Sequence, residues 1–354
     1  MARIARFQAL RYNPRQISFI SRVVAPPYDI IPPEQARTLA ARDEHNVIRL
    51  ILGKEGDSPR QGQDYENAAA ALQAWRKSGV LIQDETPSLY LCEEVFSIAG
   101  AEITRRGLFC DLLLEDLSGG NVLPHEQTSP GPKADRLKLL EACKVNLSPV
   151  LCVFSDEDGG LYEFLQGLEP GEPLYEFASD EHIVYKMWRI ADEPALKRLG
   201  ALLDGESLLI ADGHHRYDTA LAYRDRHRNN AREPGAAPED YALIYGISSR
   251  DPGLKILPTH RLVKGGDTFS QEGLLSRLAE SFDVTEVPVN TSRALVEFVE
   301  NWSPEDRLIG YYPPGGTLYL LDLENHRAPE SSLADVPGCM RDLAVSVLLH
   351  GILK

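Results

Sequence analysis

The chain has 354 residues, of which 43% are hydrophobic and 25% are charged, as in an ordinary folded globular protein. This length accommodates one large domain or two of usual size. The net charge of −16 disfavours general binding to nucleic acid or to an anionic membrane, because phosphate contacts need a basic surface. A local basic pocket for a small anion is compatible with this charge.

Targeting signals and cysteine pairs are not evident in the sequence. Met1–Phe7 carries two arginines, unlike the apolar core of a secretory signal, and no apolar run approaches the roughly 18 residues of a membrane span. The five cysteines are scattered and form no CxxC pair, which disfavours a disulfide framework or structural zinc. We therefore expect a reduced, cytoplasmic protein without membrane or nucleic-acid contacts.

The N-terminal part of the chain predicts helices followed by a β-hairpin. Ala69, Leu72 and Trp75 repeat at helical spacing, and Gly79 is a typical helix end. The elements expected up to residue 114 are a helix over Pro32–Arg42, a short strand over Asn46–Leu52, a helix over Tyr65–Ser78, and a hairpin of Leu89–Ile98 with Ile103–Leu114.

The rest of the chain continues this mixture. We expect a helix over Lys133–Lys144, strands over Pro149–Phe154 and Glu181–Ile190, a helix over Glu193–Leu203, and a strand and helix joined at Asp212-Gly213, the helix reaching about Asn230. Beyond them we expect two hairpins, Tyr241–Ser249 with Lys255–Val263 and Leu308–Tyr312 with Thr317–Leu323, helices near 270–281 and 291–301, and an apolar helix over Met340–Leu353.

Hairpins outnumber βαβ units in this reading, which favours an α+β fold with mixed, largely antiparallel sheets and surrounding helices. We expect one unit over residues 1–354. An alternative division into 1–230 and 231–354 would fall at the Pro/Ala/Gly-rich linker Ala231–Pro238.

The segment around Asp212-Gly213-His214-His215-Arg216 concentrates the most usable chemistry. A strand that ends in a tight turn before a helix presents unpaired N–H groups and a positive dipole end, which favours an anion. Arg216 adds a planar cation, and the histidines can relay protons or bind metal. The structural alternative is a helix cap, in which Asp212 caps, Gly213 turns and the histidines bond locally.

A second cluster lies on the polar loop that begins at His125-Glu126 and includes Thr128. It is not an HExxH zinc site, because Ser129 stands where histidine is required. Lys133 and Arg136 lie near a helix start, against the dipole preference, which indicates a bound anion. The alternative is a solvated loop and helix start. We expect this cluster beside the first.

Three smaller segments are candidate substrate-binding elements. Each has a structural alternative as turn or bulge chemistry. Their candidate residues are Tyr28 and Asp29 after a rigid Pro-Pro pair, Ser148 before a buried strand, and His260 and Arg261 in a predicted hairpin. P-loop, GxGxxG and GxSxG motifs are absent from the sequence.

Together these segments resemble a bacterial and archaeal family described as a domain of unknown function, DUF1015. Five motifs in the same order carry the resemblance over nearly the whole chain: Ala25-Pro26-Pro27-Tyr28-Asp29, His125-Glu126-x-Thr128 with Lys133-x-Asp135-Arg136-Leu137, Ser148-Pro149, Ala211–Arg216, and Leu257-Pro258-Thr259-His260-Arg261. Members of that family usually continue further, so the resemblance implies that a C-terminal segment is missing after Lys354.

The Asp-Gly-His-His-Arg element is also similar to the phosphate-binding element of the ParB/sulfiredoxin superfamily, over about 20 residues. Sulfiredoxins have their catalytic cysteine where this chain has His214, so reduction of sulfinic acids is not expected. The free-serine kinases of that superfamily have an Asp-Gly-His-x-Arg element of the same character.

The resemblance implies a small-molecule kinase that transfers phosphate from ATP or ADP to the hydroxyl of free serine or a similar metabolite. His215, Arg216 and the helix start at Gly213 would hold phosphates. Lys133 and Arg136 would neutralise the transferred group or grip a carboxylate, with His125 and His214 in the same site. Glu126 or Asp212 would act as base or hold Mg²⁺.

Two other classes of function stay open. A metal-dependent hydrolase would use His125, Asp212 and His214 or His215 as ligands. A regulatory module would bind nucleotide without consuming it. The expected partners are a small-molecule substrate, a nucleotide and a second copy of the chain in a homodimer.

Overall fold

The computed structural model describes residues 2–52, 62–98, 100–126, 130–168, 171–228, 232–257, 260–265, 269–302, 307–324, 333–334 and 336–353. The chain forms two compact units, Met1–Ile256 and Leu257–Lys354. The boundary between the units lies after Ile256, beyond the linker Ala231–Pro238 at which we considered a division at 230/231. It lies there because the strand β11 (Tyr241–Ser248) pairs with β5 (Ala101–Leu113) and β7 (Val150–Phe154) of the first unit.

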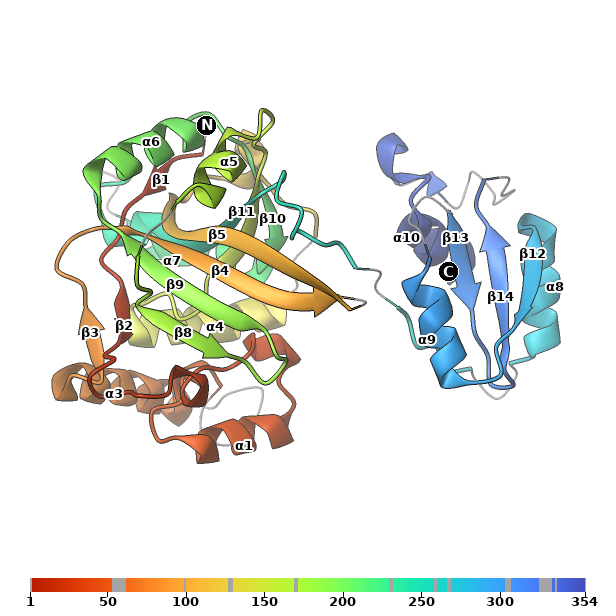
Figure 1. Ribbon diagram of the computed structural model, residues 1–354, viewed down its shortest axis with the longest axis horizontal. Coiled ribbons are helices and arrows are strands. Elements are labelled where there is room, and N and C mark those ends of the chain that lie inside the picture. Colours follow the sequence, from red (N-terminus) through yellow and green to blue (C-terminus); the bar gives the residue numbers. More distant parts are fainter. Residues whose placement is uncertain are drawn as a thin grey trace. The chain divides into compact units, whose positions relative to one another are not determined.

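The first unit is built on one mixed sheet of nine strands within the described residues (Figure 1). Its strand order is β6-β10-β7-β11-β5-β4-β9-β8, and β1 pairs with β5. Only the pairs β10–β6 and β11–β7 are parallel there. The remaining strands are β1 (Ile4–Ala5), β4 (Leu89–Ile98), β6 (Val122–Leu123), β8 (Tyr175–Ala178), β9 (Val184–Ile190) and β10 (Leu208–Asp212). The expected α+β class with largely antiparallel sheets is confirmed.

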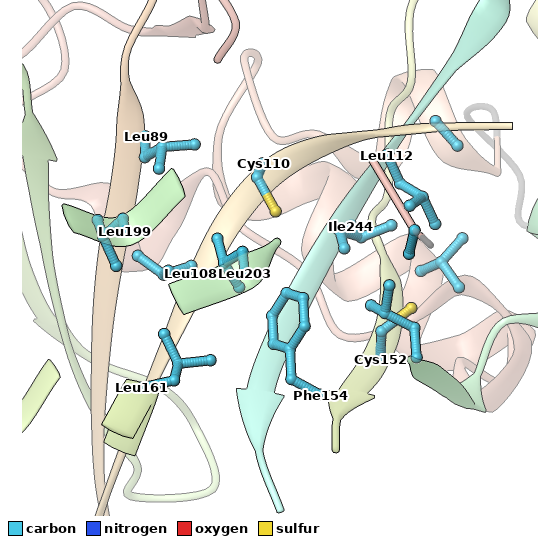
Figure 2. Packing of buried hydrophobic residues seen from close by; sticks show 14 of the residues in the cluster. Leu89, Leu108, Cys110, Leu112, Cys152, Phe154, Leu161, Leu199, Leu203 and Ile244 are labelled. Carbon is cyan, nitrogen blue, oxygen red and sulfur yellow. The ribbon is translucent and has the colours of Figure 1, made fainter. Parts of the chain in front are cut away.

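The core of the first unit is formed by this sheet and by the helices α5 (Gly160–Gln166) and α6 (Glu193–Leu203), and Tyr217 and Ala220 of the helix over His214–His227 also belong to it. Leu108 and Ile244 of the sheet are fully buried, and Leu161 and Leu199 of the two helices belong to the same buried cluster (Figure 2). Burial of these apolar side chains supplies the main driving force for folding. It therefore holds β7 and β10 in place next to the candidate site.

The other helices of the first unit pack as a second group. They are α1 (Pro33–Arg42), α2 (Ile48–Ile51), α3 (Gly62–Ser78), α4 (Pro130–Cys143) and α7 (His214–His227), with a two-stranded sheet of β2 (Leu10–Tyr12) and β3 (Leu81–Gln83). The helix α4 packs on both α3 and α7. The helices expected around 32–42, 65–78 and 193–203 and the β4–β5 hairpin are confirmed.

The strand expected over Asn46–Leu52 is wrong, because this segment forms the short helix α2. The buried side chain of Asn46 accepts a hydrogen bond from the backbone N–H of Ile48 and so starts the turn. The apolar residues Ile48, Leu50 and Ile51 are all buried. An apolar run buried on every side carries no periodicity that separates a strand from a helix.

The second unit contains a three-stranded sheet with helices beside it. Its elements are α8 (Gln271–Ser281), β12 (Val284–Pro288), α9 (Ser292–Glu300), β13 (Leu308–Tyr311), β14 (Thr317–Asp322), α10 (Ala344–Ser346) and a π-helical segment, Val347–Ile352, with the strand order β12-β14-β13. The expected β13–β14 hairpin is confirmed. The expected strand over Lys255–Val263 is wrong for its described residues, which include Ile256 and Leu262, each 93% exposed. None of the described helices is both long and apolar enough to cross a bilayer.

Asp111 of β5 provides a test of the sheet's electrostatics. Burial raises the pKa of its carboxyl to about 6, so the folded state favours the protonated form and loses stability as pH rises through about 6. We expect Asp111→Asn to raise the free energy of unfolding at pH 8 by about 1–2 kcal/mol, and by less at pH 5. Urea unfolding at both pH values measures this. An equal change at the two would contradict the assignment.

Candidate functional site

The site forms where two parallel neighbouring strands end. The strands β6 and β10 pair in parallel, so their carboxyl ends lie at the same edge of the sheet. His125 follows β6 by two residues and His214 follows β10 by two residues. The pairing of β10 with β7 is irregular between Ile210 and Asp212, and such irregularities often redirect groups at functional sites. The two histidines therefore meet.

The hydrogen bonds of these histidines fix their tautomers. The backbone N–H of His125 donates to Nε2 of His214 over 3.2 Å, so Nε2 is unprotonated and the neutral ring carries its proton on Nδ1. Nδ1 of His125 donates to the carbonyl of Ile210 over 2.7 Å, which leaves its Nε2 with a free lone pair when neutral. The rings meet edge to face, 4.5 Å apart between centroids.

Glu126 lies against both rings. Its Oε2 is 3.8 Å from Nδ1 of His214, and its Oε1 is 3.9 Å from Nε2 of His125. His214 is only 6% exposed, and burial, followed by the neighbouring His125, holds the pKa of His214 below its usual value. A neutral His214 therefore directs its Nδ1–H toward a carboxylate that is exposed to solvent, as in a site that positions a general base.

The same three residues are a candidate metal centre. Ligand atoms of His125, Glu126 and His214 all lie within 4.8 Å of one another. The hydrogen bond to Nε2 of His214 places the ring proton on Nδ1, which then offers no lone pair. Only His125 and Glu126 are left as ligands in this arrangement, fewer than the three protein ligands of a catalytic zinc site.

The turn at Gly213 is held by Arg216. Gly213 has φ +92° and precedes α7 without a side-chain cap, so the alternative role of Asp212 as the cap is wrong. The guanidinium of Arg216 instead donates to the Asp212 carboxylate and to the carbonyl of Pro149. This ties the first turn of α7 to the start of β7.

Arg136 on α4 lies close to this turn, because α4 packs on α7. Its guanidinium stacks on the ring of Tyr28 at 3.9 Å and donates to the Asp135 carboxylate and to the carbonyl of Ile51. Lys133, one turn earlier, lies 3.9 Å from Asp218 of α7. The expected proximity of the His125–Arg136 segment to the Asp212–Arg216 segment is therefore observed.

A cavity of about 60 Å³ lies between these elements. Its polar lining comes from the 3-10 turn Tyr28–Ile30, α4, the loop before β7, and α7. The polar residues that line it are Tyr28, Arg136, Asn146, Ser148, Arg216 and Thr219. Ser148 and Tyr28, expected from separate motifs, thus share one cavity with both arginines.

Other predicted residues are placed elsewhere. Asp29 is exposed beside Tyr28. His260 and Arg261 are exposed and belong to the second unit, and Thr128 lies outside the described residues. His215 is partly buried, and its Nδ1 has no hydrogen-bond partner among the described residues. Sequence reasoning missed Thr219, since a single helical hydroxyl gives no motif.

These features define an α+β protein with a Glu–His pair and an arginine-lined cavity beside the first turns of one helix. The chain belongs to the family described as "Protein of unknown function (DUF1015)", whose model matches residues 4–346. The resemblance inferred from the five motifs is thereby confirmed at the level of the family. No curated protein and no solved structure matches the chain.

Proposed function

We propose that the protein is a small-molecule kinase that transfers a phosphoryl group from ATP or ADP to the hydroxyl of free serine or a similar metabolite. The observation that carries the proposal is the carboxylate of Glu126, exposed to solvent and 3.8 Å from the buried Nδ1 of His214. A carboxylate beside a neutral histidine can accept the proton of an attacking hydroxyl. Phosphoryl transfer otherwise requires mainly positioning and cationic groups.

The surroundings of this carboxylate support phosphoryl transfer. The N-terminus of α7, which begins at His214, presents backbone N–H groups to an anion. Lys133 and Arg216 add positive charge on the neighbouring turns, although each faces a carboxylate of α7 or β10. The local similarity of the Asp-Gly-His-His-Arg element to the free-serine kinases points in the same direction.

Mg²⁺ would accompany the nucleotide, and the donor set is compatible with it. Mg²⁺ keeps several waters and uses one or two carboxylates together with substrate phosphates. Asp212 is 53% exposed and gives one oxygen to Arg216, so its other oxygen is the candidate ligand. The carboxylates of Asp212 and Glu126 both act electrostatically to raise the pKa of His214, against the dominant effect of burial.

A metal-dependent hydrolase is the second candidate, favoured by the cluster of His125, Glu126 and His214. This function requires that the hydrogen bond from the backbone N–H of His125 to Nε2 of His214 is broken, so that His214 can bind the metal. Otherwise the metal has only two of these three residues as protein ligands. Metal analysis of the purified chain separates the two functions. Stoichiometric Zn²⁺ or Mn²⁺ that survives dialysis would favour the hydrolase, whereas metal dependence met by millimolar Mg²⁺ would favour the kinase.

The kinase proposal is tested by ADP or AMP release with ATP or ADP across a panel of hydroxylated amino acids. We expect turnover with at least one acceptor and a loss of about 100-fold in Arg216→Ala. Arg293→Ala is the matched control, since Arg293 also pairs with a carboxylate four residues away along the chain. A folded protein that binds nucleotide without consuming it would contradict the kinase and favour a regulatory module.

A further inference from the structure

The cavity lies beside α7, the helix that begins at His214, and its lining indicates what it binds. Two guanidinium groups, of Arg136 and Arg216, line it, and carboxylate side chains are absent from the described lining. Asp135 and Asp212 hold these guanidiniums from outside the lining. Each guanidinium has five N–H donors, and some of these have no acceptor among the described residues.

Thr219 is an independent indication of a ligand. The residue is only 3% exposed, lines the cavity, and its Oγ1 has no hydrogen-bond partner among the described residues. A threonine inside a helix commonly donates to the carbonyl four residues before it, and a buried hydroxyl without a partner is unfavourable. A ligand oxygen in the cavity would satisfy this hydroxyl.

The size and the charge of the cavity indicate which class of ligand it binds. The enclosed volume of about 60 Å³ accommodates a group of a few atoms, such as a carboxylate, and is too small to enclose a whole nucleotide. The positive charges of Arg136 and Arg216 are matched by Asp135 and Asp212, so the cavity provides directed N–H donors with little excess charge. This suits a planar monoanion, which guanidinium groups bind through paired hydrogen bonds, better than a polyphosphate. The apolar residues Ile51, Leu139, Leu140, Val145 and Leu147 complete the described lining, as expected for a small organic molecule.

We propose that this cavity binds the carboxylate of the acceptor substrate, a small hydroxylated amino or hydroxy acid, between Arg136, Arg216 and Thr219. This inference rests on the proposed function, because it assigns the acceptor of the same site. Tyr28, stacked on Arg136, holds the guanidinium plane against one side of the cavity. The phosphate donor then lies outside the cavity, toward the N-terminus of α7.

Calorimetric titration of the full chain with L-serine, D-glycerate, ethanolamine, inorganic phosphate and ADP tests the assignment. We expect binding of at least one carboxylate compound, no binding of ethanolamine, and at least a fivefold higher Kd for that carboxylate in Thr219→Val. Thr38→Val is the matched control, because its hydroxyl is also helical and donates to the carbonyl of Glu34. Arg136→Lys, which keeps the charge and loses the planar fork, should weaken binding about tenfold or more.

The outcomes separate this inference from the kinase proposal. Carboxylate binding that weakens in Thr219→Val and Arg136→Lys, without phosphoryl transfer to any acceptor, would support the cavity and contradict the kinase. If the protein turns over and Thr219→Val and Arg136→Lys raise KM only for the nucleotide, the cavity assignment is overturned and the kinase proposal is retained. The same conclusion follows if the two variants weaken only the binding of phosphate and ADP. Carboxylate binding unchanged in both variants would also overturn it.

Discussion

Replacing Glu126 by glutamine is expected to lower kcat of the proposed phosphoryl transfer by about 10²–10⁴-fold, the usual contribution of a general base. The amide keeps the size of the side chain and removes the only group beside His214 that we assign as the proton acceptor. Because Glu126 is 68% exposed, the fold should be unaffected. Single-turnover kinetics with the best acceptor measure the loss, and circular dichroism checks the fold.

Glu176→Gln is the matched control, since Glu176 is also exposed and faces a cation, Lys186. It should leave kcat unchanged. If kcat of Glu126→Gln stays within a factor of three of the unmodified protein, the assignment of Glu126 as the base is contradicted. If Glu126 is instead a metal ligand, the same variant should lose metal affinity.

A separate prediction concerns the pH at which the ring of His214, the residue that positions Glu126, becomes protonated. Glu126 raises and burial lowers the pKa of His214, with burial dominant. We therefore expect its ring to titrate below pH 6.5 in NMR spectra, and lower still in Glu126→Gln, where the favourable charge is gone. Because the folded state disfavours protonation, the free energy of unfolding should fall as pH decreases through 6.5. Titration at or above pH 6.5 would contradict the burial argument.

Local sequence patterns predicted the parts of the site that one segment can hold. Asp212 to Arg216 lie on consecutive residues at a strand–helix junction, and Gly213 marks the turn, so their proximity follows from the chain itself. For His125 and His214, the sequence predicts only that their two clusters lie beside each other, and not that the two rings are in contact. The cause of this contact, the parallel pairing of β6 with β10, involves a strand of two residues, Val122–Leu123, which is too short to show periodicity.

The cavity could not be predicted because no segment contains it. Tyr28, Arg136 and Ser148 come from three separate motifs, and only the packing of the folded chain, including that of α4 on α7, places them around one space. Thr219 gives no sequence signal, since its significance depends on burial without a partner. The sequence leaves a cap at Asp212 open as an alternative, because it does not show that Arg216 turns back toward this carboxylate.

Gly213→Ala is the second variant with a large expected effect, since this glycine serves the turn in two ways. Its φ of +92° costs an alanine about 1 kcal/mol. A Cβ at this position would also lie 2.7 Å from Nε and 2.8 Å from Cζ of Arg216, so the guanidinium must move away. It then loses its bonds to Asp212 and Pro149, and we expect a total destabilisation of about 2–4 kcal/mol.

Gly100→Ala separates the two effects, because Gly100 has φ +80° and open space where a Cβ would be added. Urea unfolding should show a loss of about 1 kcal/mol there, and the excess in Gly213→Ala measures the displacement of Arg216. The displaced guanidinium no longer lines the cavity, so Gly213→Ala should weaken carboxylate binding as Arg136→Lys does, whereas Gly100→Ala should not. Equal unfolding losses in the two variants would mean that the contacts of Arg216 add nothing to the stability of the turn, and the tie between α7 and β7 would have to be attributed to the packing of Tyr217 in the core.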